Sequence, residues 1–307
     1  MSARRISKFL CALMLGAAML AQAAAPAQKV FPSPEAGASA LVEALKANDA
    51  AALSAILGRR GLDLIGLRPQ PADEKPHERF LAAYASSNRL VPQGDAKVVL
   101  EVGEDSWPFP IPLVKSASGW RFDPQLGERE VLARRIGRNE LAAIQVCLAI
   151  GDAEREYASS ERDNDKVLKY SPRFVSTQGR QDGLYWESAQ GEPLSPLGPF
   201  VAAAGIDSAV PKAGLERGPY QGYFYRILTR QGKNAEGGAY SYVAHGKMIG
   251  GFAVLAYPAR HAYSGIKTFM VSQDGEVFEK DLGPNTRAIA QKIQSFDPDS
   301  SWTKLPR

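Results

Sequence analysis

The sequence predicts an α+β protein of two domains, each made of helices packed on an antiparallel sheet, joined through a long central helix. Apolar residues recur at helical spacing in two regions, 34–57 and 128–159. Runs that alternate like strands follow each helical region, at 96–122 and 220–277. Helices followed by a strand meander are typical of the α+β class, and 307 residues are enough for two such domains.

Residues 1–23 have the three parts of a secretory signal peptide. Three basic residues precede an apolar run from Phe9 to Leu20, and small residues stand at Ala21 and Ala23, where signal peptidase cleaves. The run is shorter than the roughly 20 apolar residues that span a bilayer. We therefore expect a cleaved signal at 1–23, a linker at 24–30, a periplasmic or secreted mature chain, and no transmembrane segment after cleavage.

Charge and cysteine content exclude some classes of partner and site. The net charge is +4, and removing the three basic residues of the signal leaves +1, which gives no electrostatic reason to bind nucleic acid. Of the two cysteines, Cys11 lies in the signal. The other, Cys147, lies in an apolar stretch of helical type, so we expect a small buried side chain rather than a reactive thiol.

The first domain is expected at 31–127. Ser33 and Pro34 are a helix cap and a first helical residue, Asn48-Asp49 caps a second helix that Gly58 ends, and a third helix is expected over 75–88. Strands are expected at 96–102 and 120–122, with a proline-rich edge segment at 107–114. This order, with Gly119-Trp120-Arg121-Phe122 as its closing hairpin, resembles the cone-shaped domains of the nuclear-transport-factor-2-like (NTF2-like) superfamily.

The second domain is expected at 128–307. One long helix is predicted from Glu128 to about Ser159, with an apolar stripe that includes Leu141 and Cys147 and with a bend near Gly137. Strands are predicted at 220–229, 240–244, 251–257 and 266–272, Asp274-Gly275 predicts a two-residue hairpin, and a short helix closes the domain at 285–296. A helix, an irregular loop and an antiparallel meander resemble the globular heads of type IV pilins and pseudopilins.

Five strings stand out in the chain after the signal: 107–114 (WPFPIPLV), 134–141 (RRIGRNEL), 182–186 (DGLYW), 195–199 (SPLGP) and 248–253 (MIGGFA). With these strings, nearly the whole chain after the signal resembles the bacterial family known as domain of unknown function 2950. The resemblance implies an exported protein and brings no known activity.

An acidic loop is the candidate metal site. Glu161, Asp163 and Asp165 stand on alternate residues, as oxygen ligands do at the start of a calcium loop. Lys166 occupies the position where such a loop turns on glycine, so a solvated loop at the end of the long helix is the alternative. Apart from this candidate Ca²⁺, no cofactor is expected.

Other candidate chemistry lacks a supporting motif. The three histidines form no zinc-binding pair, and His245 is expected in a hairpin turn. Ser195 is not in a nucleophile elbow. The glycine-rich segment 232–238 lies between predicted strands, and we expect a hairpin loop rather than a phosphate-binding loop.

Aromatic residues are the candidate binding residues. Alternation places Tyr223 and Tyr225 on one face of a strand, and Trp186 precedes that strand in the chain. Such a face would recognise a partner, since tyrosine combines apolar area with a polar tip. A sheet covered on both faces is the alternative.

These observations leave three hypotheses open. The preferred one is a non-enzymatic periplasmic module that binds another envelope protein or has a structural role. The second is a hydrolase or other enzyme with a ligand cavity in the first domain. The third is a structural protein stabilised by calcium.

Overall fold

The chain has the predicted α+β architecture and divides into two compact units, Met1–Gly127 and Glu128–Arg307. The structure is a computed structural model that describes residues 28–65, 76–161, 166–188, 191, 194–198 and 218–306. The predicted signal peptide and most of the predicted linker lie outside these residues. No helix in the described part of the chain is long and apolar enough to cross a membrane.

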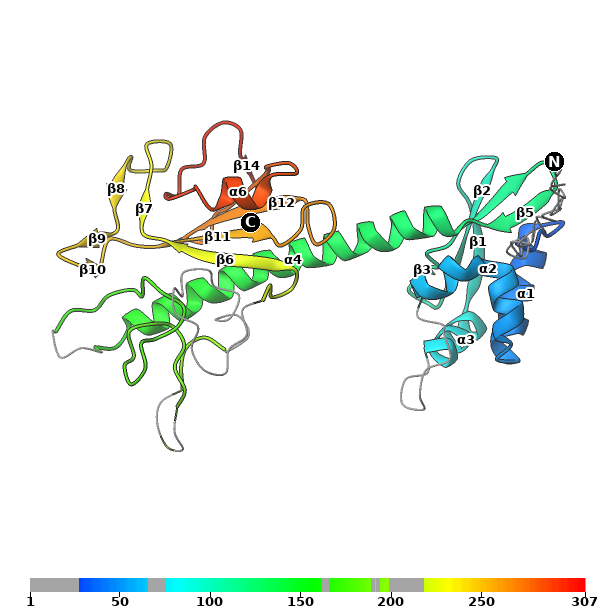
Figure 1. Ribbon diagram of the computed structural model, residues 1–307, viewed down its shortest axis with the longest axis horizontal. Coiled ribbons are helices and arrows are strands. Elements are labelled where there is room, and N and C mark those ends of the chain that lie inside the picture. Colours follow the sequence, from blue (N-terminus) through cyan, green and yellow to red (C-terminus); the bar gives the residue numbers. More distant parts are fainter. Residues whose placement is uncertain are drawn as a thin grey trace, which may run out of the picture. The chain divides into compact units, whose positions relative to one another are not determined.

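The first unit packs three helices with an antiparallel sheet in one apolar core (Figure 1). The sheet has the order β1-β2-β4-β5, with β3 paired to β2. Strand β2 alternates between partly buried and buried residues, which is the predicted period. Its elements are α1 (Pro34–Lys46), α2 (Ala50–Ile65), α3 (Pro76–Ser86), β1 (Asn88–Pro92), β2 (Lys97–Val102), β3 (Trp107–Pro108), β4 (Leu113–Ser116) and β5 (Gly119–Phe122).

Local chemistry explains the helix ends in this unit. The Ser33 hydroxyl accepts a hydrogen bond from the Ala36 amide at the start of α1, at 3.3 Å. The Asp49 carboxylate does the same for the Ala51 and Ala52 amides of α2. Gly58, expected to end the second helix, adopts φ 71° and interrupts α2, but a further helical segment follows it. The third helix ends at Ser86, so Asn88 begins β1 instead of ending a helix.

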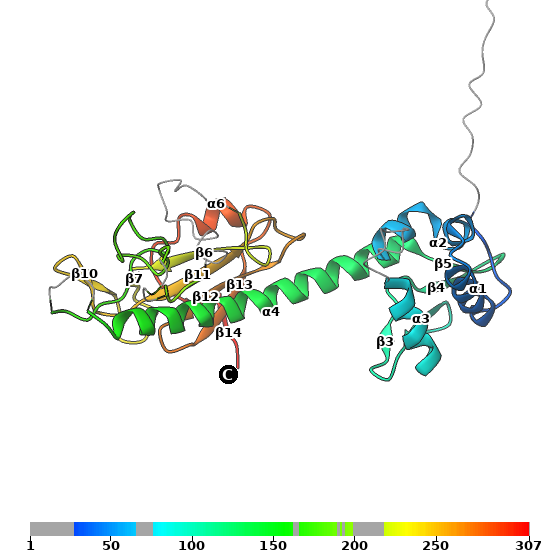
Figure 2. The same cartoon turned by 90° about the horizontal axis from the view of Figure 1, so that it is seen from below.

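The second unit is built on the long helix α4 (Pro124–Ala158), which crosses the boundary between the units (Figures 1 and 2). Its main sheet has the order β14-β13-β12-β11-β6, and two small hairpins, β7–β8 and β9–β10, complete it. Its strands and short helix are β6 (Tyr223–Leu228), β7 (Arg230–Gln231), β8 (Tyr240–Ser241), β9 (Val243–Ala244), β10 (Lys247–Met248), β11 (Ala253–Pro258), β12 (Lys267–Ser272), β13 (Val277–Asp281), α6 (Thr286–Ala290) and β14 (Thr303–Lys304).

Helix α4 differs from its prediction in three respects. It begins at Pro124, before the expected Glu128, because the Asp123 carboxylate accepts the Gln125 and Leu126 amides as an N-cap. It continues through Gly137 as one helix. Leu141, expected in the apolar stripe, is 68% exposed, because the buried face follows a different set of positions. That face includes Ala143, Cys147, Ile150, Glu154 and Tyr157.

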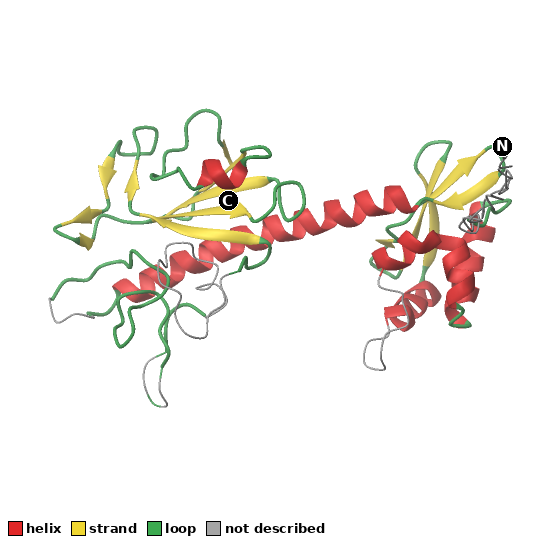
Figure 3. Cartoon of the chain, viewed as in Figure 1, coloured by secondary structure: helices red, strands yellow, loops and turns green. Residues whose placement is uncertain are grey.

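Both faces of strand β6 are covered, which is why nearly all of its residues are buried (Figure 3). One face, with Tyr223 and Tyr225, shares the core with α4. On the other face, the Arg226 guanidinium donates to the carbonyls of Ala290 and Gln291 at the end of α6. The sheet is therefore a central layer between two helical elements.

The hairpin between β12 and β13 is one residue longer than predicted. The Ser272 amide donates to the Glu276 carbonyl, and the Gly275 amide donates to the Ser272 carbonyl, which leaves three residues in the loop. Gly275 has φ 76°, a left-handed conformation that favours glycine. The Asp-Gly signal located the turn correctly, and the extra residue is the glycine bulge typical of three-residue hairpins.

Candidate functional site

The three aromatic residues predicted to bind a partner are buried in the second unit. Tyr223 and Tyr225 are fully buried and Trp186 is 7% exposed. The Tyr223 hydroxyl donates to the Lys267 carbonyl at 2.9 Å, and the Tyr225 hydroxyl donates to the Tyr220 carbonyl at 3.3 Å. Burial raises the pKa of both phenols. This is the alternative of a sheet covered on both faces, and none of the three side chains is offered on the surface.

The acidic loop is described only at its edges. Asp163 and Asp165 lie outside the described residues. The Glu161 carboxylate accepts a hydrogen bond from the Lys166 amide at 2.9 Å, and Lys166 has the left-handed φ of 56°. No cluster of three or more potential metal ligands occurs in the described part of the chain. The calcium site therefore stays a prediction.

Cys147 and His245 have the surroundings that the sequence predicts. Cys147 is fully buried on α4, and burial raises the pKa of its thiol. His245 and Gly246 form the two-residue turn between β9 and β10 with φ 52° and 75°. Two positive φ values define the type I′ hairpin turn. A buried thiol and a turn histidine both have structural roles here.

The glycine-rich segment 232–238 joins β7 to β8, as expected for a hairpin loop. The side-chain amide of buried Gln231, at the end of β7, donates to the carbonyls of Glu236 and Gly238 in this loop at 2.6 and 2.7 Å. The Asp297 carboxylate also holds the loop, because it accepts from the main-chain and side-chain amides of Asn234 at 2.8 and 2.9 Å. These contacts order the loop without a ligand.

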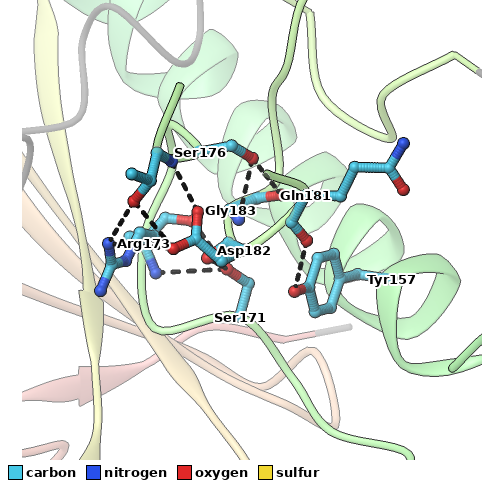
Figure 4. A network of polar contacts seen from close by, with 8 residues as sticks. Tyr157, Ser171, Arg173, Ser176, Gln181, Asp182 and Gly183 are labelled. Atoms are coloured by element: carbon cyan, nitrogen blue, oxygen red, sulfur yellow. Dashed lines mark hydrogen bonds and ion pairs between the residues drawn. The ribbon is translucent and has the colours of Figure 1, made fainter. Parts of the chain in front are cut away.

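A polar turn contains Asp182 and Gly183 of the 182–186 string, and Figure 4 shows its network of polar contacts. The Asp182 carboxylate accepts from the Thr177 amide at 2.6 Å and from the Thr177 hydroxyl at 2.8 Å, and Arg173 lies 3.4 Å away. Partial burial acts to raise the pKa of Asp182, but the Thr177 hydrogen bonds and the Arg173 charge outweigh it and lower the pKa. The Gly183 amide donates to the Ser176 hydroxyl at 2.9 Å.

Two side chains of α4 hold this turn against the helix. The Tyr157 hydroxyl donates to the Gln181 carbonyl at 2.8 Å (Figure 4). The Glu154 carboxylate is fully buried and accepts from the Ser171 amide at 2.8 Å through one oxygen, while its other oxygen has no hydrogen-bond partner among the described residues. Burial raises the pKa of Glu154 well above its usual value, so the neutral form is favoured.

A second pair of α4 side chains holds the segment between β11 and β12. The Asn139 amide donates to the Ser264 carbonyl at 2.8 Å. The Glu140 carboxylate accepts from the amides of Ile266 and Lys267 at 2.8 and 3.0 Å. Both residues belong to the 134–141 string. Their hydrogen bonds hold α4 to the segment that leads into β12.

An exposed aromatic residue that sequence reasoning missed, Tyr263, lies next to Ser264 in the segment that Asn139 and Glu140 hold. Tyr263 is 45% exposed, and the guanidinium carbons of Arg135 and Arg260 lie 4.8 and 4.5 Å from the centre of its ring. Arg135 is on α4, and Arg260 is in the segment that follows β11. Only the fold brings them together, because 125 positions separate them in the chain.

The fold is α+β, and two of the five strings, 134–141 and 182–186, make hydrogen bonds that hold loops of the second unit. The chain belongs to the family described as "Protein of unknown function (DUF2950)", whose match covers residues 28–305. This confirms the family that the sequence resembles. No curated protein and no solved structure matches the chain. The resemblances of its two halves to NTF2-like cones and to pilin heads stay predictions.

Proposed function

We propose that the protein is exported and works outside the cytoplasm as a non-catalytic binding or structural module. The observation that carries the proposal is that the side chains with reactive groups are buried or engaged in contacts within the fold. Cys147, Glu154 and Tyr223 are buried in the core of the second unit, and each of the last two hydrogen-bonds to the main chain. His261 is partly buried, and its imidazole is engaged with the Asp281 carboxylate at 2.9 Å.

Export is supported by the sequence of residues 1–23, with its basic start, apolar run and small residues before the cleavage point. The test is cell fractionation of the full chain followed by sequencing of its first residues. We expect a mature protein that begins at Ala24 in the periplasm or medium, and we expect Ala23→Tyr to leave the precursor uncleaved. An intact Met1 on wild-type protein in the cytosol would contradict export.

Binding is supported by exposed apolar side chains around β8–β10. Leu168, Tyr240 and Ile249 are 59%, 43% and 48% exposed. They belong to adjoining segments: Tyr170 bridges to Met248, the Ile249 amide donates to the Tyr242 carbonyl, and the rings of Tyr240 and Tyr242 are 5.4 Å apart. Exposed apolar side chains on neighbouring segments are a feature of surfaces that contact another protein.

The partner we propose is another envelope protein, and site-specific crosslinking tests this. A photoreactive residue at Ile249 is expected to give a discrete adduct in cells, and the same residue at exposed Lys292 is the matched control. Equal adduct patterns at the two positions would contradict a binding surface around β8–β10.

A further inference from the structure

Two arginine side chains lie against the ring of Tyr263. These contacts are separate from the hydrogen bonds by which Asn139 and Glu140 hold the same segment. The contacts at 4.8 Å from Arg135 and 4.5 Å from Arg260 place two positive charges beside one exposed ring. Both positive charges lie close to one ring centre, and an anion bound beside them would relieve their mutual repulsion. Arg138 adds a third charge one helical turn along α4 from Arg135.

The charge of this cluster is not neutralised within the described residues. Arg135, Arg138 and Arg260 make no ion pair or side-chain hydrogen bond there. Neighbouring cations differ: Arg134 pairs with Glu130 at 2.8 Å, and Lys267 pairs with Glu279 at 3.1 Å. The guanidinium N–H groups of the cluster are therefore available to an external acceptor.

The carboxylate that α4 contributes to this region is already engaged. Glu140 directs an oxygen to the amides of Ile266 and Lys267. The Asp281 carboxylate accepts from the Gly283 amide and faces His261, and the first of these bonds is the main cause of its lowered pKa. Among the described residues, neither Glu140 nor Asp281 forms an ion pair with an arginine of the cluster.

The segment that carries Arg260 and Tyr263 is held in one conformation. The Ser264 amide donates to the Arg260 carbonyl at 2.9 Å, and the Arg260 amide donates to the Ser264 hydroxyl at 3.0 Å. Ala262, between them, has the left-handed φ of 57°, which is unfavourable for a residue with a Cβ. The turn therefore holds Arg260 and Tyr263 in a fixed relation, which lowers the ordering cost of binding a ligand there.

We propose that Arg135, Arg260 and Tyr263 form a binding site for a phosphate group, with Arg138 as an additional cation. Guanidinium groups match the oxygens of phosphate in pairs, and a phosphomonoester carries about −1.5 to −2 charges near neutral pH, which balances two arginines better than one carboxylate does. The Tyr263 hydroxyl is a further donor. The phosphate belongs either to a free solute or to a lipid headgroup.

Titration of the mature chain with sodium phosphate at constant ionic strength, followed by calorimetry, tests the site. We expect saturable binding by the wild type and a loss of affinity of about tenfold or more in Arg135→Gln/Arg260→Gln, a change equivalent to about 1.4 kcal/mol. The matched control is Arg287→Gln, which removes a single arginine from the ring of Phe224, at 5.3 Å. This control is expected to bind like the wild type.

Folding and ligand source are checked with the same proteins. Arg135→Lys/Arg260→Lys keeps both charges but not the paired geometry, so it should bind more weakly than the wild type and better than the glutamine variant. Circular dichroism confirms that each variant is folded. Flotation with phosphatidylcholine vesicles that contain phosphatidic acid indicates a headgroup, and phosphate binding without flotation indicates a free solute. A wild type that binds neither, or a glutamine variant that binds phosphate like the wild type, overturns the proposal.

Discussion

Two carboxylates on α4 hold two segments of the second unit, and their environments differ. Glu140 is partly buried, and one of its oxygens accepts two main-chain N–H groups. Glu154 is fully buried, accepts one such group, and has an oxygen without a partner among the described residues. The two residues are 14 positions apart. That spacing is close to four helical turns, so both lie on the same side of α4.

The difference shows that two glutamates can each hold a segment on α4 while the free energy of burying their carboxyl groups differs. A partly buried carboxylate keeps some solvent and contributes to the contact by accepting two main-chain hydrogen bonds. A carboxyl group without solvent is expensive to charge, so it is held in the neutral form and its hydrogen bond is weaker. We therefore expect the Glu140 contact to stabilise the fold at neutral pH. At position 154, we expect an uncharged side chain to give a more stable fold than glutamate does.

The largest effect is expected from Gly183→Ala, in the turn that Glu154 and Tyr157 hold. A Cβ on Gly183 would lie 2.5 Å from the Ser176 amide nitrogen, and main-chain atoms cannot move aside cheaply. We expect a loss of about 3 kcal/mol or more in the free energy of unfolding, measured by urea denaturation. The control is Gly198→Ala, which has open space and should cost less than about 1 kcal/mol. Equal effects of the two changes would contradict the close packing of the turn.

Glu140→Met is expected to have the next largest effect. It keeps the volume of the side chain but leaves the amides of Ile266 and Lys267 without their acceptor. We expect a loss of about 2 kcal/mol in the free energy of unfolding, in the range for hydrogen bonds to a charged group. Glu140→Gln retains an acceptor and should lose less. A fully stable methionine variant would show that solvent replaces the carboxylate.

Glu154→Gln is expected to change the pH dependence of stability. The folded-state pKa of Glu154 is raised, so above its ordinary pKa the unfolded chain loses a proton that the folded chain keeps. Wild-type stability then falls with rising pH by at most about 1.4 kcal/mol per pH unit, until the folded-state pKa is reached. The glutamine variant lacks this slope and should be the more stable at neutral pH. Parallel unfolding curves from about pH 4 to about pH 8 would contradict the buried neutral acid.

The smallest effect is expected at Cys147. Its thiol is fully buried and its pKa is raised, so the native chain should react with a thiol reagent only after unfolding. The measurement is the labelling rate with and without denaturant. Rapid labelling of the native chain would show that the core around α4 opens more readily than its packing indicates.

The elements that were predictable from sequence are those that depend on local chemistry. Ser33 and Asp49 cap their helices, strand β2 alternates in burial, and His245-Gly246 turns between strands, because each signal lies within a few residues of its effect. The start of α4 was missed, although Asp123-Pro124 is itself a local cap signal. The end of the third helix was missed because Asn88 enters β1 through pairing with Val102.

The polar contacts of α4 could not be predicted, because their partners are distant main-chain groups. Glu154 accepts from an amide 17 residues away, and Glu140 from amides more than 120 residues away. The sequence also offered no reason to join Arg135 to Tyr263, and it left open whether Tyr223 and Tyr225 face solvent or core. Those answers depend on which helix covers which face of the sheet.

The most direct test of this account is hydrogen exchange at single amides in Glu140→Met and Glu154→Met. Each carboxyl group holds its own segment, so Glu140→Met should speed exchange at Ile266 and Lys267 and leave Ser171 unchanged. Glu154→Met should speed exchange at Ser171 and leave the other two amides unchanged. Equal effects of either variant on both segments would contradict the claim that each carboxyl group holds only its own segment. So would unchanged exchange at all three amides in both variants.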